Sequence, residues 1–262
     1  MKVKGFVIFG FVALIAGGSL AAYAATRKDF VFNKYKDEEV TINEVSYATN
    51  DLSKIYLDVK TDTVKFISED RDDILIKNKT FYELSYTINL ENNELSIVEN
   101  EYKNWYDFLS IDYMGKAHVF HSVPLEIIVP KTLKVVYDID VSAGTINIEG
   151  IDANRIKLHV SAGTVSMNDV NVNEANIDIS AGTVNIENAI VNEMSAHISA
   201  GTYIYTGEIK KKGTFDVSAG TGTINLKFTD AKENYTVNGV GSGASIITGT
   251  KAAGTFTYSD NH

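Results

Sequence analysis

The sequence contains a 19-residue repeat, and at one position of it aspartate and histidine alternate from copy to copy. These equivalent positions form a column, which is the strongest candidate for chemistry in the sequence. It consists of Asp140, His159, Asp178, His197 and Asp216. Imidazole with carboxylate suits a zinc-like ion, and two carboxylates facing one groove can hydrolyse a glycosidic bond. On stacked strands, however, neighbouring members would lie about 4.8 Å apart on a flat surface, and the nearest carboxylates about 10 Å apart. Ligands in a flat row converge poorly on a metal ion. The distance between the nearest carboxylates also exceeds the usual separation of the catalytic pair in glycosidases.

The plainer interpretation of this column is a surface ladder. Five stacked aspartates would repel one another, and alternation with histidine relieves that repulsion. We therefore treat the five residues as a candidate surface ladder and expect no catalytic residue, no cofactor and no metal ion. The serine that recurs in each repeat has no reason to be activated as a nucleophile five times over, which also argues against an enzyme.

A Ser-Ala-Gly-Thr motif sets the spacing of the column. Its serines and glycines are Ser142 and Gly144, Ser161 and Gly163, Ser180 and Gly182, Ser199 and Gly201, and Ser218 and Gly220. A fixed period of this length is typical of a solenoid, in which each repeat is one coil stacked on the next. In the second copy Ile156, Leu158, Val160 and Ala162 alternate, as in a strand with one buried face. The parity shifts after the glycine, which predicts a corner whose backbone a Cβ would strain.

These patterns together predict an all-β fold, a single-stranded parallel β-helix with 19-residue coils. No copy has a helical 3.6-residue pattern, and neither the leucine-rich repeat nor the calcium-binding nonapeptide is present. Asn154, Asn173 and Asn192 share a second column, which predicts a turn and hydrogen bonds between stacked amides. The five clean copies would form a rod about 24 Å long.

The N-terminus indicates export. Lys2 and Lys4 precede an uncharged stretch from Gly5 to Thr26. This stretch is long enough to anchor the chain as one apolar helix, with the lysines inside and the body outside the membrane. The alternative is a signal peptide cleaved after Ala22-Tyr23-Ala24. The net charge of −10 argues against nucleic-acid binding, and the absence of cysteine excludes disulfides.

Four regions follow from this organisation: an anchor or signal at 1–26, a linker with a weak strand at 27–50, an N-terminal β region at 51–135, and the regular solenoid with its closing coil at 136–262. In the third region, the run from Val59 to Val64 resembles a degenerate (worn) copy of the repeat motif. A hairpin is expected around Glu91–Glu94. Four aromatic residues then crowd one segment: Tyr102, Trp105, Tyr106 and Phe108. They are expected to cover the open end of the solenoid, or else to contact a partner or a sugar.

A Val-Pro-Lys step at Val129-Pro130-Lys131 opens onto the clean repeats, after a lone apolar N-terminal segment and worn β repeats. This arrangement resembles the bacterial putative-adhesin family over roughly residues 45–260. The resemblance implies a β-solenoid outside the membrane, in some members linked to envelope stress, and it supplies no catalytic residues.

We therefore expect a non-enzymatic extracytoplasmic protein of the cell envelope, with a structural or interaction role. Its expected location is the cell membrane, as a single-pass protein, or the exterior after signal cleavage. The expected partners are the membrane, through the N-terminal segment, and a cell-wall glycan or an envelope protein. The rival class is a polysaccharide-binding or polysaccharide-processing β-helix.

Overall fold

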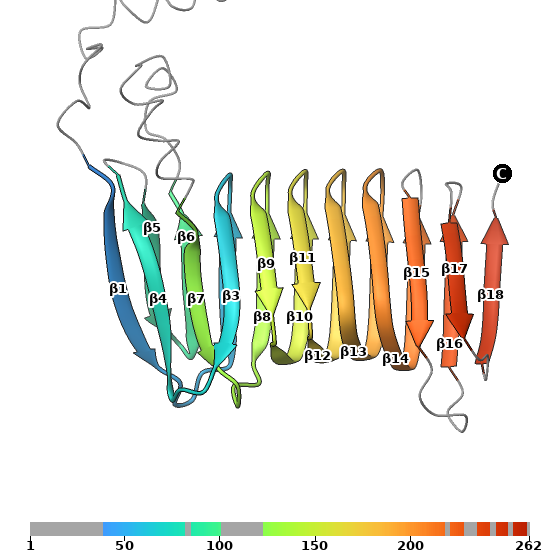
Figure 1. The fold of residues 1–262 in the computed structure, drawn as a ribbon, viewed down its shortest axis with the longest axis horizontal. Helices are drawn as coiled ribbons and strands as arrows, with labels where there is room; N and C mark the ends of the chain where they lie inside the picture. Colours follow the sequence, from blue (N-terminus) through green and yellow to red (C-terminus); the bar gives the residue numbers. More distant parts are fainter. Residues whose placement is uncertain are drawn as a thin grey trace, which may run out of the picture.

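All regular structure in the described part of the chain is β-strand. The computed structural model describes residues 39–81, 85–100, 123–217, 221–227, 235–241, 245–250 and 254–260. Figure 1 shows the strands as a row of stacked coils. The strands are β1 (Thr41–Ala48), β2 (Lys54–Val59), β3 (Thr63–Glu69), β4 (Asp73–Thr80), β5 (Tyr86–Glu91), β6 (Glu94–Glu99), β7 (Leu125–Pro130), β8 (Val136–Val141), β9 (Thr145–Glu149), β10 (Asp152–Val160), β11 (Thr164–Asn168), β12 (Asn171–Ile179), β13 (Thr183–Ile198), β14 (Thr202–Val217), β15 (Thr221–Lys227), β16 (Tyr235–Gly241), β17 (Ser245–Thr250) and β18 (Gly254–Asp260). No helix among these residues could cross a membrane.

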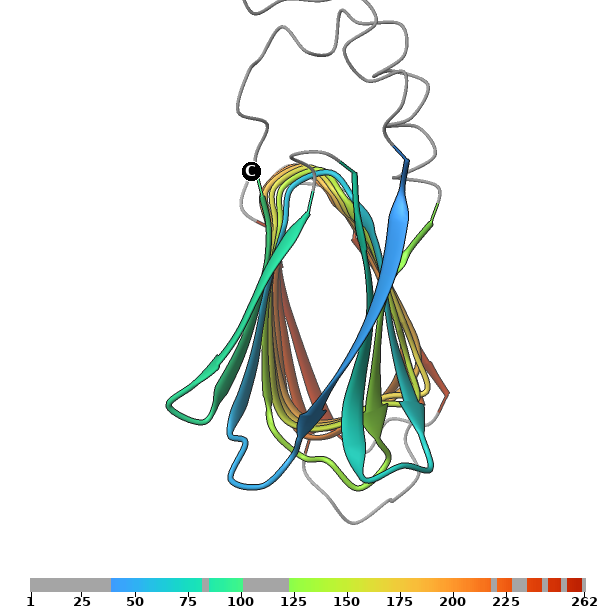
Figure 2. The same ribbon diagram turned by 90° about the vertical axis from the view of Figure 1, so that its left-hand side faces the viewer.

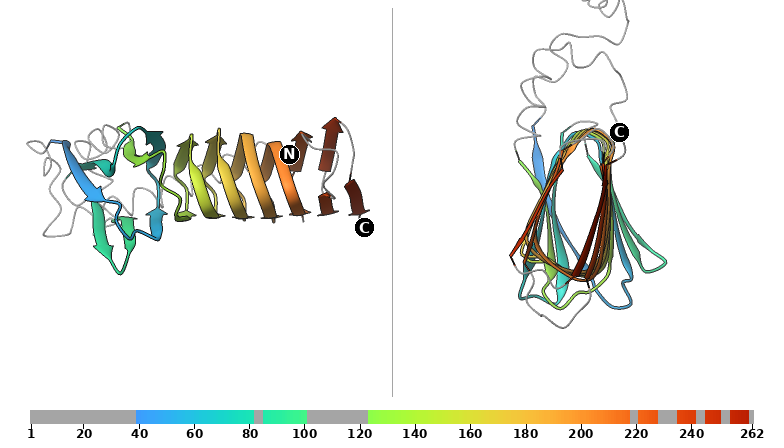
Figure 3. Two further views of the ribbon diagram at one scale, coloured as in Figure 1. Left: turned by 90° about the horizontal axis from the view of Figure 1, so that it is seen from below. Right: turned by 90° about the vertical axis from the view of Figure 1, so that its right-hand side faces the viewer.

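The coils stack in parallel with the predicted period. On one side of the coil β8, β10 and β12 pair in sequence, and on the other side β9, β11 and β13 do so. The strands β13 and β14 are long enough to bend and serve both sides. Thr145 pairs with Thr164, which pairs with Thr183, so each coil advances by 19 residues. Seen along the axis, the strands superpose into a flattened loop (Figure 3), which confirms the solenoid.

The core is a set of apolar columns inside this loop. The column before the motif is fully buried at Val141, Val160, Ile179 and Ile198, and the column after it at Ile146, Val165, Val184 and Tyr203. Burial of one such side chain contributes about 1.5–3 kcal/mol. Because every coil repeats these positions, the stack is held by one continuous core, and the outward positions remain free for polar residues.

The Ser-Ala-Gly-Thr corner differs from the prediction in two respects, the residue that faces inward and the reason for the glycine. Ala162 is exposed, and Gly163 takes the inward position instead. None of the motif glycines in the described residues has a positive φ. The glycine is required by close approach, because a Cβ on Gly163 would lie 2.5 Å from both the carbonyl oxygen of Gly144 and Cγ1 of Val141. Adjacent corners are also bonded, since Ala162 N donates to Ser142 O at 2.8 Å.

The asparagine column lies at a second corner, but without a left-handed backbone. In the regular coils, the residues with positive φ stand elsewhere, at Gly150, Asp169 and Asn188. The predicted amide stacking is present in part, because Asn192 Nδ2 donates to Asn173 Oδ1 at 3.0 Å. In the first copy, Asn154 Nδ2 donates instead to the backbone carbonyl of Lys134.

The N-terminal region is threaded out of sequence order. The strands β2 and β3 form a coil that stacks directly on β8 and β9, with Thr63 opposite Thr145. This register confirms that the run Val59–Val64 is a worn copy of the motif. On its other side this first coil pairs with β6 and β7, which come much later in the chain. The first coil is therefore enclosed between two segments that follow it in sequence.

Antiparallel strands finish this end of the rod. The strand β1 pairs with β4, and β4 with β7 (Figure 2), and β1 is a strand within the range 27–50, where a linker with a weak strand was predicted. The predicted hairpin is β5–β6, with Asn92 and Asn93 in the left-handed region at its turn. The predicted N-terminal helix, the aromatic segment at 102–108, and the last motif copy at Ser218 and Gly220 lie outside the described residues.

Candidate functional site

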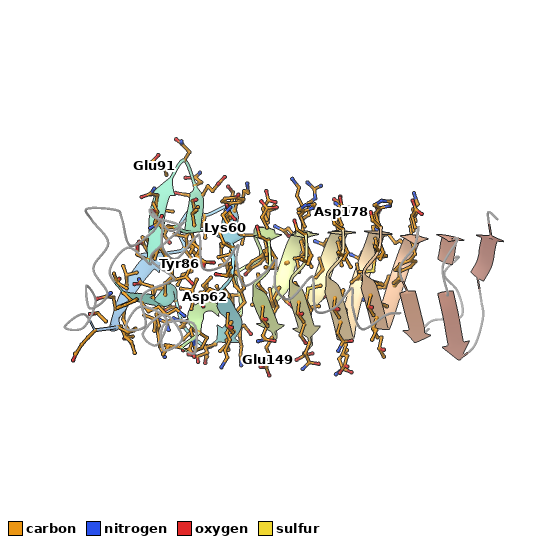
Figure 4. The ribbon with its side chains drawn as sticks, turned by 90° about the horizontal axis from the view of Figure 1, so that it is seen from above. Lys60, Asp62, Tyr86, Glu91, Glu149 and Asp178 are labelled. Atoms are coloured by element: carbon orange, nitrogen blue, oxygen red, sulfur yellow. The ribbon has the colours of Figure 1, made fainter. Side chains whose placement is uncertain are left out.

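The predicted Asp/His column is a continuous ladder on the outside of the rod. His159 pairs with Asp140 on one side and Asp178 on the other, and His197 pairs with Asp178 and Asp216. His197 Nδ1 lies 3.1 Å from Asp216 Oδ2, and these two side chains are about half exposed. The contact of His159 with Asp178 is looser, at 3.7 Å. Figure 4 shows Asp178 on the outer surface of its coil.

The ladder extends into the first coil, which the sequence pattern did not reveal. Asp58 pairs with Asp140, so two carboxylates are neighbours there. The hydroxyl of Tyr56 donates to Asp140 Oδ2 at 3.1 Å, and Lys60 Nζ lies 3.1 Å from Asp58 Oδ2. These contacts compensate the like charges that no histidine separates.

A shallow hollow runs along the ladder. Most of the residues that line it are polar, and the other two are Leu158 and Ile177, which are buried in the core. The polar members are Asp138, Lys157, His159, Asn176, Asp178, Ser195 and His197. Donors and acceptors alternate along this Asp/His face at the strand spacing, which suits a partner with many hydroxyl or amide groups. Within the described ranges, no three metal-binding side chains converge.

Replacement of both His159 and His197 by aspartate is expected to destabilise the rod. The change would place six carboxylates in consecutive register, from Asp58 to Asp216. Each new like-charge neighbour costs about 0.2–1 kcal/mol on a sheet surface, and salt screens the repulsion. The urea midpoint should therefore fall at low salt and recover at high salt. The double asparagine variant is the control, and equal midpoints for the two variants at low salt would contradict a coupled ladder.

A second polar group is buried at the first coil, and it was not predicted. Asp62 is fully buried, Lys79 is 1% exposed and Glu99 is 4% exposed. Asp62 occupies the place of the motif glycine, since Thr63 is opposite Thr145. In the clean copies this position faces the preceding corner. In the clean copies the motif forms a three-residue connection between strands, such as that from β8 to β9. The connection from β6 to β7 is 25 residues long, so the stack of corners ends here and the side chain of Asp62 fits.

Glu99 caps the end of the corner stack. In the next coil, Ser142 N and Ala143 N donate to backbone carbonyls of the first coil, at 2.9 and 2.7 Å. In the first coil, the corresponding N–H groups of Lys60 and Thr61 donate to Glu99 Oε2, at 2.6 and 3.0 Å. Asp62 N also donates to this oxygen, at 3.3 Å. The carboxylate therefore takes the place of a missing coil, as a side chain does at a helix N-cap.

Lys79 and Tyr86 complete the cluster around the carboxylate of Asp62. Lys79 Nζ lies 2.9 Å from Asp62 Oδ1 and also donates to the carbonyl of Val123. The hydroxyl of Tyr86 donates to Asp62 Oδ2. Burial lowers the pKa of Lys79, and the neighbouring carboxylates of Asp62 and Glu99 oppose this shift only in part. Figure 4 labels Asp62 and Tyr86 in this N-terminal part of the rod.

The fold and this cluster define a class of protein: a parallel β-solenoid whose N-terminal end is closed by antiparallel strands and a buried polar cap. The chain belongs to the Toastrack DUF4097 family, whose model matches residues 52–250. No curated protein matches the sequence.

Two solved structures are similar to this chain. A protein from Parabacteroides distasonis, described as a putative adhesin, is 13% identical with a TM-score of 0.50, and the match covers 86% of this chain and 95% of that one. A protein from Clostridium sporogenes, described as a putative cell adhesion protein, is 14% identical with a TM-score of 0.42, over 82% of this chain and 100% of that one. At 13% identity the likeness to the Parabacteroides distasonis protein concerns the fold alone.

Proposed function

We propose that this protein is a non-enzymatic rod of the bacterial cell envelope that contacts a partner through the Asp/His face. The observation that carries the proposal is the face itself: polar side chains repeat in strict register along stacked coils. Such a surface offers many weak and equivalent contacts, which suits adhesion better than it suits a reaction centre. The carboxylates of Asp140 and Asp178 are separated by the coil of His159, which disfavours paired-carboxylate hydrolysis.

The proposed location is the membrane, with the body outside. The apolar stretch Gly5–Thr26 and the lysines before it support this orientation. The chain then enters the described part next to β1, and the regular coils lead away from that end (Figure 1). The coils would thus project the Asp/His face outward from an N-terminal tether.

Cell fractionation tests the tether. We expect the protein in the membrane fraction, accessible to protease added outside, with the first residues of the sequence still present by mass spectrometry. A mature N-terminus at Ala25 would replace the anchor with a cleaved signal peptide, and a protease-protected body would contradict the proposed orientation.

Polysaccharide binding is the second candidate function. The amides, hydroxyls and charges that line the hollow on the Asp/His face favour it, because sugar hydroxyls can both donate and accept hydrogen bonds. A pull-down with purified cell wall, followed by a glycan screen, separates this candidate from a protein partner.

Matched variants locate the contact in that pull-down. Alanine at His159 and Asn176 should weaken binding if the Asp/His face is used, whereas alanine at Ser166 and Asn185, which lie on the other side of the coil, should not. Equal loss from both pairs of substitutions would contradict the assignment of the face.

A further inference from the structure

The buried Lys79–Asp62 contact brings together the amine and the carboxylate that an isopeptide bond would join. We propose that Lys79 and Asp62 condense to an intramolecular isopeptide bond, which ties the antiparallel cap to the first coil of the solenoid. The amine nitrogen lies 2.9 Å from Asp62 Oδ1. Oδ1 is bonded directly to Cγ, the carbon that the amine must approach to within about 3–3.5 Å for the bond to form.

The surroundings of the pair favour condensation over a persistent ion pair. Asp62 is fully buried and Lys79 is 1% exposed. Two charges that are removed from water carry a large desolvation penalty, which a neutral amide does not. The water that forms is released to solvent. The lowered pKa of Lys79, caused by burial, also increases the share of neutral amine, the nucleophilic form.

The reaction balances without an external reagent. The Nζ–Cγ bond forms and the Cγ–Oδ2 bond breaks. Two protons of the lysine ammonium group pass to Oδ2, which leaves as water, and nothing is oxidised or reduced. The hydroxyl of Tyr86, which donates to Oδ2, is placed to hand over one proton and regain another.

Glu99 acts as a positioning residue in this proposal. Its carboxylate binds the backbone N–H groups of Lys60, Thr61 and Asp62. These bonds fix the corner from which the Asp62 side chain projects toward Lys79. The amine also donates to Val123 O, which holds it against the carboxylate.

Peptide mapping of the purified full-length protein tests the bond. Trypsin should yield a branched peptide in which the segment 61–65 is joined through Asp62 to the segment that begins at Asn78, lighter than the two separate peptides by one water. The linear 61–65 peptide should be nearly absent. Recovery of that linear peptide in full, together with cleavage after Lys79, would overturn the proposal.

Two variants identify the partners. In Asp62→Asn the same branched peptide should form with loss of ammonia in place of water, so its mass should equal that of the wild-type peptide. In Lys79→Arg the branch should vanish, whereas Lys77→Arg, which alters a surface pair with Glu126, should retain it. A branch that survives Lys79→Arg would refute the assignment. The wild-type digest decides the question even where a variant fails to fold.

Discussion

Replacing Gly182 with alanine is expected to lower the free energy of unfolding by about 3 kcal/mol, the upper end of ordinary overpacking costs. A Cβ at this position would lie 2.4 Å from Cγ1 of Val160 and 2.5 Å from the carbonyl oxygen of Gly163. That carbonyl cannot move away freely, because it accepts the N–H of Thr183 at 2.9 Å. The two coils would have to separate locally. Valine, with a larger side chain, should cost more.

Urea unfolding followed by circular dichroism measures this effect. The matched control is Ala181→Ser, one residue earlier in the same corner, where the side chain is exposed and the change should stay within about 0.5 kcal/mol. If Gly182→Ala unfolds at the wild-type urea concentration, the close approach of neighbouring corners is not a constraint on this fold.

Replacing Glu99 with alanine is expected to be at least as damaging, with a loss of about 3–5 kcal/mol. The change removes the acceptor of three backbone N–H groups at once, those of Lys60, Thr61 and Asp62. The bond of Asp62 N is buried and the other two are partly buried, and a buried donor without a partner costs about 1–3 kcal/mol. Thr61 Oγ1, which donates to Glu99 Oε1 at 3.1 Å, also loses its acceptor.

Glutamine separates the hydrogen-bond role of Glu99 from its charge. A glutamine oxygen can still accept from the three N–H groups, and its amide can donate to Thr61 Oγ1. We therefore expect Glu99→Gln to lose less than half as much stability as Glu99→Ala. The partly exposed pair of Glu94 with Lys54 supplies a control, since Glu94→Ala should cost no more than about 1 kcal/mol. Equal loss in the glutamine and alanine variants would mean that charge, not capping, is the contribution of Glu99.

The repeated part of the fold could be predicted from sequence because its signal recurs. The period of 19 residues and the Asp/His column follow from identical residues at equal spacing, and the strand register confirms both. Even the worn copy at Val59–Val64 was recognisable, because alternation survived although the small residues did not. The predicted orientation of Ala162 and Gly163 was wrong. The prediction extended the inward–outward alternation of the strand into a corner, where the alternation no longer holds.

The cap could not be predicted, because it occurs once. Lys79 and Glu99 are charged residues in strands, and nothing in their spacing separates them from surface charges such as Lys77 and Glu94. The available signal was Asp62, a carboxylate at the position where every clean copy has glycine. A residue with a side chain can stand there only if no corner precedes it, which identifies the end of the stack.

The threading of the first coil has a consequence for the order of folding. Thr63 pairs with Thr145, 82 positions further along the chain, whereas Thr145 pairs with Thr164, only 19 positions further. Closing the longer loop costs about 1.3 kcal/mol more in chain entropy. The regular coils can therefore form early from nearby residues, while β2 and β3 must wait for both β6–β7 and β8–β9. Although the N-terminal part of the rod is synthesised first, we expect it to become structured last.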